Sequence, residues 1–279
     1  MEKQESKGNL NKGITLFVVV AMSFMATLDS SIVNVVLPVM SEKMDVPLSS
    51  IEWVVAIYSI IICSTLLFFF FFGDILGKTK IFQYGSILFT LASLMCGLCH
   101  SFVPLVICRL IQGIGASAYM ATNQGIIAEM YPKEKRGKAL GILMAAVALG
   151  TMVGPPAGGF ILSVLSWNYI FLINVPIGIV IFLLGTKYLP KSKGNKEKLD
   201  VKGAILLFGG TLLLFGALIE SQQIGFLNPF ILGSILISII LIFFFVRLEQ
   251  RVEQPLLELN ILKNFQFSIN LFCALLLFI

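Results

Sequence analysis

The chain has 279 residues, of which 57% are hydrophobic and only 13% are charged, and its formal net charge is +5. Soluble domains carry about 25% charged residues, so this composition excludes a soluble single-domain protein and predicts a polytopic membrane protein. The net charge does not indicate nucleic-acid binding, because the cations are gathered in short segments between long apolar runs.

The first twelve residues are polar, and a long apolar run begins at Gly13. This run is too long for a signal-peptide core and lacks a small-residue cleavage site, so we expect it to be retained as the first span. Further runs of spanning length follow along the chain. The predicted membrane helices cover residues 14–38, 51–72, 81–100, 102–124, 139–163, 168–189, 203–220 and 229–246, and a ninth begins at Phe265.

The basic residues predict the orientation of these spans. With the N-terminus in the cytoplasm, 18 of the 20 lysines and arginines fall in segments on the inner side, Lys43 falls in an outer loop and Arg109 lies within a span. The positive-inside rule therefore predicts a multi-pass protein of the cell (inner or plasma) membrane with a cytoplasmic N-terminus. The same cations are expected to face the anionic headgroups of the lipid bilayer.

A basic linker divides the predicted spans into two groups. Six spans, a basic linker and further spans are a layout typical of transporters made of helical bundles, and the predicted fold class is an all-α membrane protein. The predicted parts are a cytoplasmic tail at 1–12, a six-helix bundle at 13–189, the linker at 190–202, two additional transmembrane helices at 203–246, a cytoplasmic loop at 247–264 and a partial ninth helix at 265–279.

Asp29 lies in the first span, where a charge is expensive and usually functional. Two interpretations are open. The carboxylate either hydrogen-bonds its neighbours Ser30 and Asn34 as structural glue, or it faces a cavity as a protonatable or cation-binding group. We take the second interpretation as the working hypothesis.

Arg109 lies in the fourth span, three residues before Gln112. Arginine stays protonated, so it cannot carry a transported proton, but it can bias a nearby carboxylate toward ionisation and so set when a proton binds. The alternative is an arginine near the outer end of its span that extends toward the headgroups.

The fifth span carries the most informative pattern of the chain. Gly150, Gly154 and Gly158 recur every four residues, so they lie on one helix face and allow another backbone to approach closely. Pro155 and Pro156 remove two backbone donors and are expected to bend the helix, which a membrane bundle tolerates where neighbours satisfy the freed carbonyls. This pattern favours a moving bundle over a passive anchor.

No cofactor, no metal site and no enzymatic activity are predicted. Residues 96–100 match the C-x-x-C-H haem pattern, but they end an apolar helix without a haem domain around it, so the cysteines are expected to pack between helices. The G-x-G at 113–115 follows no strand and is not a dinucleotide fingerprint. The sequence contains no His, Asp or Glu cluster with metal spacing and no nucleophile–base set.

These residues together resemble the major facilitator superfamily, in particular the fourteen-helix drug:proton antiporters of the EmrB/QacA type. The resemblance is carried by residues 28–38, 109–115, 150–159 and 167–178, which match motifs of the first, fourth, fifth and sixth helices in that order. It implies proton coupling and a substrate cavity at Asp29, Asn34, Arg109 and Gln112. It implies gating and helix packing at Gly113, Gly115, Gly150, Gly154, Pro155, Gly158 and Gly159, with the glycine face against a helix of the second bundle.

The loop after the second span matches the family less well. Asp74, Gly77 and Lys78 are similar to the core of the family's cytoplasmic motif, in which an aspartate and basic residues latch the two bundles together. The family usually has a small glycine where this chain has Phe70. The next inner loop, residues 132–138, is expected to supply a compensating charge for Asp74, and Arg136 in this loop is expected to belong to the latch.

The resemblance implies proton-coupled efflux of small hydrophobic or cationic substrates by alternating access. Its expected partners are those substrates, protons and the lipid bilayer, with no nucleic acid. Fourteen spans need far more than 279 residues, so a C-terminal bundle is expected to be missing and the chain to be truncated within its ninth helix. The alternative is a non-transporting truncated remnant, or a membrane scaffold or subunit that requires a second bundle.

Overall fold

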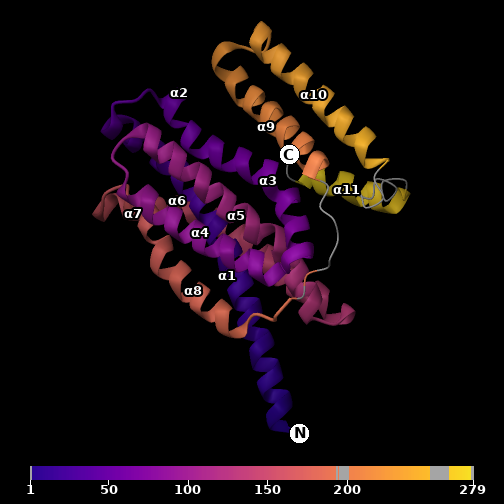
Figure 1. The fold of residues 1–279 in the computed structure, drawn as a ribbon. Coiled ribbons are helices and arrows are strands. Elements are labelled where there is room, and N and C mark those ends of the chain that lie inside the picture. Colours follow the sequence, from indigo (N-terminus) through magenta and orange to yellow (C-terminus); the bar gives the residue numbers. More distant parts are fainter. Residues whose placement is uncertain (1, 193, 195–200, 252–263, 278–279) are drawn as a thin grey trace. The chain divides into compact units, whose positions relative to one another are not determined.

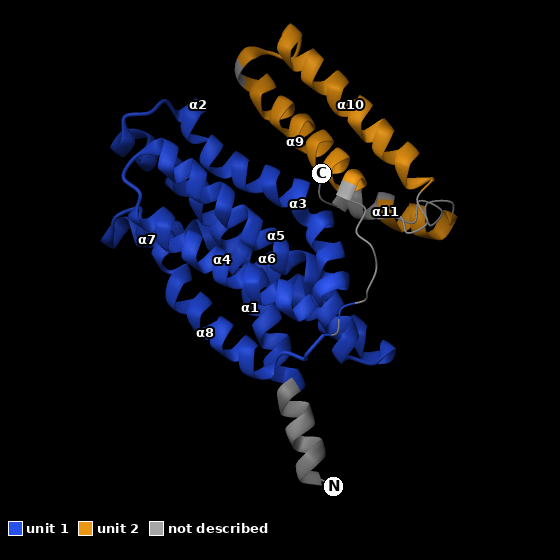
Figure 2. Cartoon of the chain, in the orientation of Figure 1, with its two compact units in different colours: residues 1–196 blue, residues 197–279 orange. Residues whose placement is uncertain are grey.

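The computed structural model of the chain describes residues 2–192, 194, 201–251 and 264–277. These residues form helices and their connections without a strand, which confirms the predicted all-α fold class. The chain divides into two compact units, residues 1–196 and 197–279 (Figures 1 and 2).

Within the described residues, six segments of the first unit and two of the second are long and apolar enough to cross a membrane, which agrees with the eight complete spans predicted. The helices of the first unit are α1 (Glu2–Met44), α2 (Leu48–Ile51), α3 (Trp53–Leu76), α4 (Lys78–Leu98), α5 (Phe102–Met130), α6 (Lys133–Val164), α7 (Tyr169–Leu172) and α8 (Asn174–Tyr188).

Some helix boundaries differ from the predicted spans. The second span is divided between α2 and α3 at Glu52, and the sixth between α7 and α8 at Ile173. Other helices run beyond the apolar sequence: α5 continues to Met130 and α6 already begins at Lys133. Polar residues can extend a helix past the hydrocarbon layer, so the apolar run underestimates its length.

Small residues let α5 approach two neighbours closely in the first unit. A Cβ atom added to Gly115 would lie 2.5 Å from the backbone nitrogen of Phe89 on α4. A Cβ atom added to Gly113 would lie 3.0 Å from the carbonyl oxygen of Tyr58 on α3. Both glycines therefore have the packing role predicted for them, and they fix the position of the polar side chains that α5 carries.

The second unit contains α9 (Val201–Ile224), α10 (Pro229–Glu249) and α11 (Phe265–Leu277). A short turn joins α9 to α10 in a helical hairpin (Figure 1), and Gly225 in this turn has φ +87°, which favours glycine. The Asn228 side chain caps α10 by accepting a 2.9 Å hydrogen bond from the backbone of Phe230. Ser238 ties the two helices together, since its hydroxyl donates to the carbonyl of Gly210 over 2.7 Å.

Candidate functional site

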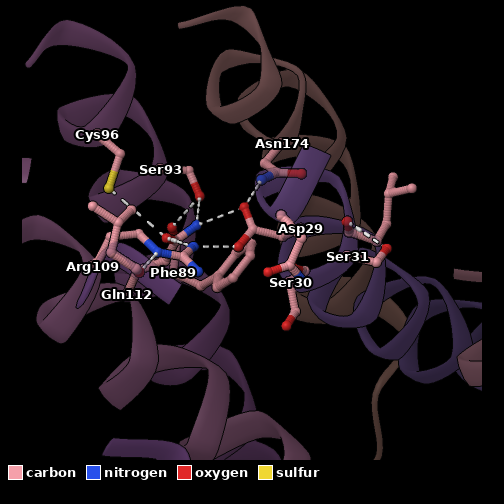
Figure 3. A network of polar contacts seen from close by, with 12 residues as sticks. Asp29, Ser30, Ser31, Phe89, Ser93, Cys96, Arg109, Gln112 and Asn174 are labelled. Carbon is pink, nitrogen blue, oxygen red and sulfur yellow. Dashed lines mark hydrogen bonds and ion pairs between the residues drawn. The ribbon is translucent and has the colours of Figure 1, made fainter. Parts of the chain in front are cut away.

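A buried carboxylate on α1 is the centre of a polar network (Figure 3). Asp29 has no exposed surface, and its two oxygens accept hydrogen bonds from two other helices. Arg109 Nη1 donates to Oδ2 over 2.5 Å. Gln112 Nε2 and Asn174 Nδ2 donate to Oδ1 over 3.1 and 2.7 Å. One carboxylate therefore joins α1 to α5 and α8.

The guanidinium of Arg109 is also fully buried. Its Nε donates to the carbonyl oxygen of Val54 on α3 over 2.9 Å, and its Nη1 donates to Gln112 Oε1 over 2.7 Å. Its Cζ lies 4.1 Å from the ring centroid of Tyr58, a distance typical of a cation–π contact. The alternative in which Arg109 extends toward the headgroups is therefore wrong, because its partners lie inside the bundle.

Gln112 extends the network to α4. Its Nε2 donates to Ser93 Oγ over 2.8 Å, and Cys96 Sγ lies 3.8 Å from its Oε1. Ser93 in turn donates to the carbonyl oxygen of Phe89 over 2.8 Å. Both ends of the Gln112 amide are thus engaged, so the amide cannot rotate without breaking several bonds.

Of the two charged side chains at the centre of the network, only Asp29 can change its charge. Arginine stays protonated, while Asp29 can be ionised or neutral. Arg109 Nη2 and Asn174 Oδ1 are buried and have no hydrogen-bond partner among the described residues. Buried polar atoms are normally bonded, so these two atoms are available to a water molecule or a ligand. The described residues contain no group of His, Cys, Asp or Glu placed to hold a metal ion.

Asn34 lies outside this network, although it was predicted to share the cavity of Asp29. It is exposed, and its Nδ2 donates to the carbonyl oxygen of Ser30, one turn earlier on α1, over 3.2 Å. The structural-glue alternative, in which Asp29 bonds Ser30 and Asn34, is therefore wrong. The partners of the carboxylate come from helices that are distant in sequence.

The glycine row of α6 packs against α1, the helix that carries Asp29. A Cβ atom added to Gly154 would collide with the side chain of Ser31, and one added to Gly150 or Gly158 would press on other residues of α1. The Ser31 hydroxyl also donates to the carbonyl oxygen of Gly150 over 3.1 Å. The close approach predicted for this face is confirmed. The prediction that a second-bundle helix covers it is wrong, because α1 occupies the position.

The prolines and the last glycine of the fifth-span motif are not part of this close packing against α1. Helix α6 continues through Pro155 and Pro156 as one helix. A Cβ atom added to Gly159 would have no contact within 4 Å among the described residues, so Gly159 does not belong to the packed row.

A second polar cluster joins α3, α4 and α5 where α3 turns into α4. Lys78 Nζ lies 3.0 Å from the carboxylate of Asp74 and 3.1 Å from that of Glu129. Gly77 joins the two helices with φ +99°, a conformation that favours glycine. Asp74, Gly77 and Lys78 are thus brought together as predicted.

Arg136 is not part of this cluster. Its Nε donates to the carbonyl oxygen of Tyr131 over 2.9 Å, close to the start of its own helix. The prediction that it compensates Asp74 is therefore wrong, and Lys78 neutralises Asp74 instead. Phe70, at the position where the family usually has glycine, is 45% exposed on α3.

Sequence reasoning did not include Asn174, Ser93 or Glu129 among the site residues. An amide or hydroxyl within an apolar run is a signal for the first two, because polar side chains in membrane helices often bond across to another helix. Glu129 gives no comparable signal, since charged residues are common where a span ends.

Known proteins resemble the chain in family, in sequence and in fold. The family described as Major Facilitator Superfamily matches residues 19–278. The chain is 36% identical to the riboflavin transporter RibZ of Clostridioides difficile, over 93% of the chain and 56% of that protein. It is 32% identical to the methylenomycin A resistance protein of Bacillus subtilis, over 95% of the chain and 57% of that protein.

A solved structure of the peptide transporter POT in complex with sulfate shares the fold. The TM-score is 0.63 at 14% sequence identity, and the match covers 85% of this chain and 52% of that one. The chain spans about half the length of the curated relatives it matches.

Proposed function

This chain belongs to the major facilitator superfamily, and we propose that it supplies the proton-coupled half of an exporter for hydrophobic, often cationic compounds. The compounds would leave the cell by alternating access, in exchange for protons that enter down their gradient. The observation that carries the proposal is the buried pair of Asp29 and Arg109, in which only Asp29 is able to take up a proton. The pair bonds α3 and α8 directly, and Gln112 links it to α4.

A proton and a cationic substrate compete for Asp29 in this mechanism. With the carboxylate ionised, Arg109 neutralises it and both charges are buried. When Asp29 takes up a proton, it loses its negative charge, while the guanidinium of Arg109 stays positive. Arg109 is then a buried charge without a counter-charge, which is costly in free energy. A conformation that hydrates Arg109 relieves this cost, so protonation favours that conformation. A substrate cation at Asp29 takes the place of the proton.

The glycine row of α6 would transmit this change. Asp29 lies two residues before Ser31, which bonds the backbone of Gly150. A shift of α1 that follows protonation therefore has to move α6 as well, because close-packed helices cannot slide freely past each other. This contact supports the proposed gating role of Gly150, Gly154 and Gly158.

We infer from the distribution of basic residues that the N-terminus and the cluster of Asp74, Lys78 and Glu129 lie on the cytoplasmic side of the cell membrane. In this orientation the cluster is the cytoplasmic latch, and it holds the inner ends of α3, α4 and α5 together in one of the transport states. A second bundle is the partner against which this latch and the substrate cavity would close.

The names of the relatives suggest two substrate classes. The methylenomycin A resistance protein favours export of an antibiotic, as proposed here. The riboflavin transporter RibZ favours a second candidate, carriage of a neutral heteroaromatic vitamin. Such a substrate offers no positive charge to Asp29, so the two candidates differ in whether substrate binding depends on that carboxylate.

Binding of tetraphenylphosphonium, a hydrophobic cation, to the purified chain tests the proposal. Asp29→Asn is expected to weaken binding about tenfold or more and to remove its dependence on pH. Glu42→Gln removes the same charge at an exposed position of the same helix and is expected to leave binding unchanged. Cation binding that persists unaltered in Asp29→Asn would contradict the proposal.

Two other outcomes separate the alternatives. Riboflavin binding that is insensitive to Asp29→Asn would favour the vitamin carrier. A correctly inserted chain that binds neither compound would favour a scaffold or subunit that requires a second bundle.

A further inference from the structure

A basic pocket lies at one end of the α9–α10 hairpin, in the second unit. Its volume is about 540 Å³. Three cations line it, Lys202 in the first turn of α9 together with Arg247 and Arg251 where α10 ends. Leu206, Phe243 and Phe244 supply most of its apolar wall. None of these residues belongs to the network around Asp29, so the pocket needs its own explanation.

Apart from Leu248, which lies between the two arginines, the lining is layered along the helix axes. Leu206 follows Lys202 by four residues, and Phe243 precedes Arg247 by four. Four helical residues correspond to about 6 Å, so the apolar side chains lie about one turn further from the helix ends than the cations. A phospholipid has its charged and apolar parts in the same order, because its charged headgroup lies at the membrane surface and its acyl chains lie deeper in the bilayer.

The cations of the pocket are available to an anion. The ion pairs formed among the described residues all lie in the first unit, and none involves Lys202, Arg247 or Arg251. Arg247 Cζ lies 5.4 Å from the ring centroid of Phe243, a cation–π distance, and such a contact does not need the N–H donors of the guanidinium. Phe243 and Phe244 are both more than half exposed, as expected of side chains that meet lipid.

We propose that this pocket binds one anionic phospholipid of the cytoplasmic leaflet. Lys202, Arg247 and Arg251 contact the phosphate, and an acyl chain lies along Leu206, Phe243 and Phe244. Basic pockets between membrane helices on the cytoplasmic side suit such headgroups, and this end of the hairpin is cytoplasmic in the orientation inferred from the basic residues. A free phosphate would leave the apolar wall unused. The inference does not depend on the transport proposal.

Native mass spectrometry of the full chain, stripped of lipid and titrated with lipids of identical acyl chains, tests the inference. Phosphatidylglycerol is expected to bind as a single tight copy, and phosphatidylcholine is expected to bind weakly. Lys202→Gln, Arg247→Gln and Arg251→Gln are each expected to weaken phosphatidylglycerol binding about fivefold. The matched control is the triple variant Lys133→Gln, Lys135→Gln, Lys138→Gln, which removes three exposed cations at the start of α6 and is expected to have no effect.

Two further measurements separate the lipid from a soluble anion. Phe243→Ala with Phe244→Ala is expected to weaken phosphatidylglycerol binding and leave glycerol phosphate binding unchanged. Binding of the lipid to the unaltered chain is expected to weaken as sodium chloride rises, which tests the electrostatic part without any variant.

Three results would overturn the inference. These are equal affinity for phosphatidylglycerol and phosphatidylcholine, equal loss in the pocket variants and the α6 control, and glycerol phosphate binding as tight as that of the lipid. Circular dichroism of each variant confirms that helical content is retained.

Discussion

Arg109 and Asp29 neutralise each other inside the first unit, and neither side chain has exposed surface. A buried ion pair adds little stability compared with apolar packing, yet removal of one partner is strongly destabilising because the other charge stays buried. The pair is therefore better suited to a switch than to structural support. Protonation of Asp29 is the natural way to break it, and the proposed exchange of protons for substrate uses that step.

Arg109→Gln is expected to lower the free energy of unfolding by about 3–5 kcal/mol, because it leaves the Asp29 carboxylate buried without a counter-charge. Adding Asp29→Asn to the same chain is expected to recover much of this loss, since two neutral amides leave no charge unpaired. Unfolding by sodium dodecyl sulfate in mixed micelles, followed by circular dichroism, measures both. Losses that simply add in the double variant would mean that the two side chains do not interact.

Gly154→Ala is expected to cost about 1–3 kcal/mol, because the new methyl group would collide with Ser31 on α1. Gly159→Ala is the matched control on the same helix and is expected to be neutral or slightly stabilising, since its Cβ has open space and alanine favours helix. Thermal unfolding of the two variants in the same detergent compares them. Equal melting temperatures would contradict the packing of α6 on α1.

The thiol of Cys99, between α4 and α5, is expected to react slowly near neutral pH. Burial, with a hydrogen bond to Cys108, raises the pKa of Cys99 to about 11. A raised pKa keeps the thiol protonated at pH 8, and only the thiolate is a good nucleophile. Labelling by a membrane-impermeant maleimide is therefore expected to be roughly 10- to 100-fold slower at pH 8 than at an exposed cysteine, and to accelerate as the pH is raised from neutral.

This labelling experiment uses a chain in which Cys63 and Cys273 are replaced by Ala. The control adds Cys99→Ala and Ser166→Cys, which places a thiol at an exposed position between α6 and α7. Reaction of Cys99 at the rate of the control at pH 8 would contradict the raised pKa. With a cytoplasmic N-terminus, the connection between the third and fourth spans, which contains Cys99, lies on the outer side. Labelling of Cys99 from the cytoplasmic side would therefore contradict the inferred orientation.

Lys78→Gln is expected to destabilise the chain by less than about 1 kcal/mol, although it breaks two ion pairs, because these pairs are partly exposed to solvent. The loss is expected to shrink in high salt, since screening weakens exposed pairs. Lys80→Gln, which removes an exposed cation two residues later, should not change the unfolding free energy. A loss of several kcal/mol that salt does not alter would mean that the latch is part of the rigid core.

The spans and the fold class could be predicted because hydropathy and length act locally along the chain. The glycine row could also be read as a face for close approach, since its four-residue period defines one side of a helix. Periodicity does not say which helix covers that side. The covering helix is α1, whereas the family resemblance implies a helix of a second bundle.

The network around Asp29 could be predicted only in part. A charge within a span marks Asp29 and Arg109 separately, but they are 80 positions apart in sequence, and nothing local shows that they pair. The same limit explains why Arg136 was assigned to Asp74 when Lys78, four residues along and across a glycine turn, is its partner. Whether two side chains on different helices form a pair depends on which helix faces meet. The packing of the whole bundle determines this, and the local sequence does not show it.

Proton release on substrate binding is the measurement that tests the central claim most directly. The purified chain in weakly buffered solution with a pH-sensitive dye is mixed with tetraphenylphosphonium at a series of pH values. If the cation and the proton compete for Asp29, about one proton is released per bound cation, while Glu42→Gln behaves like the unaltered chain and Asp29→Asn releases none. Stoichiometric cation binding without proton release by the unaltered chain would contradict the account.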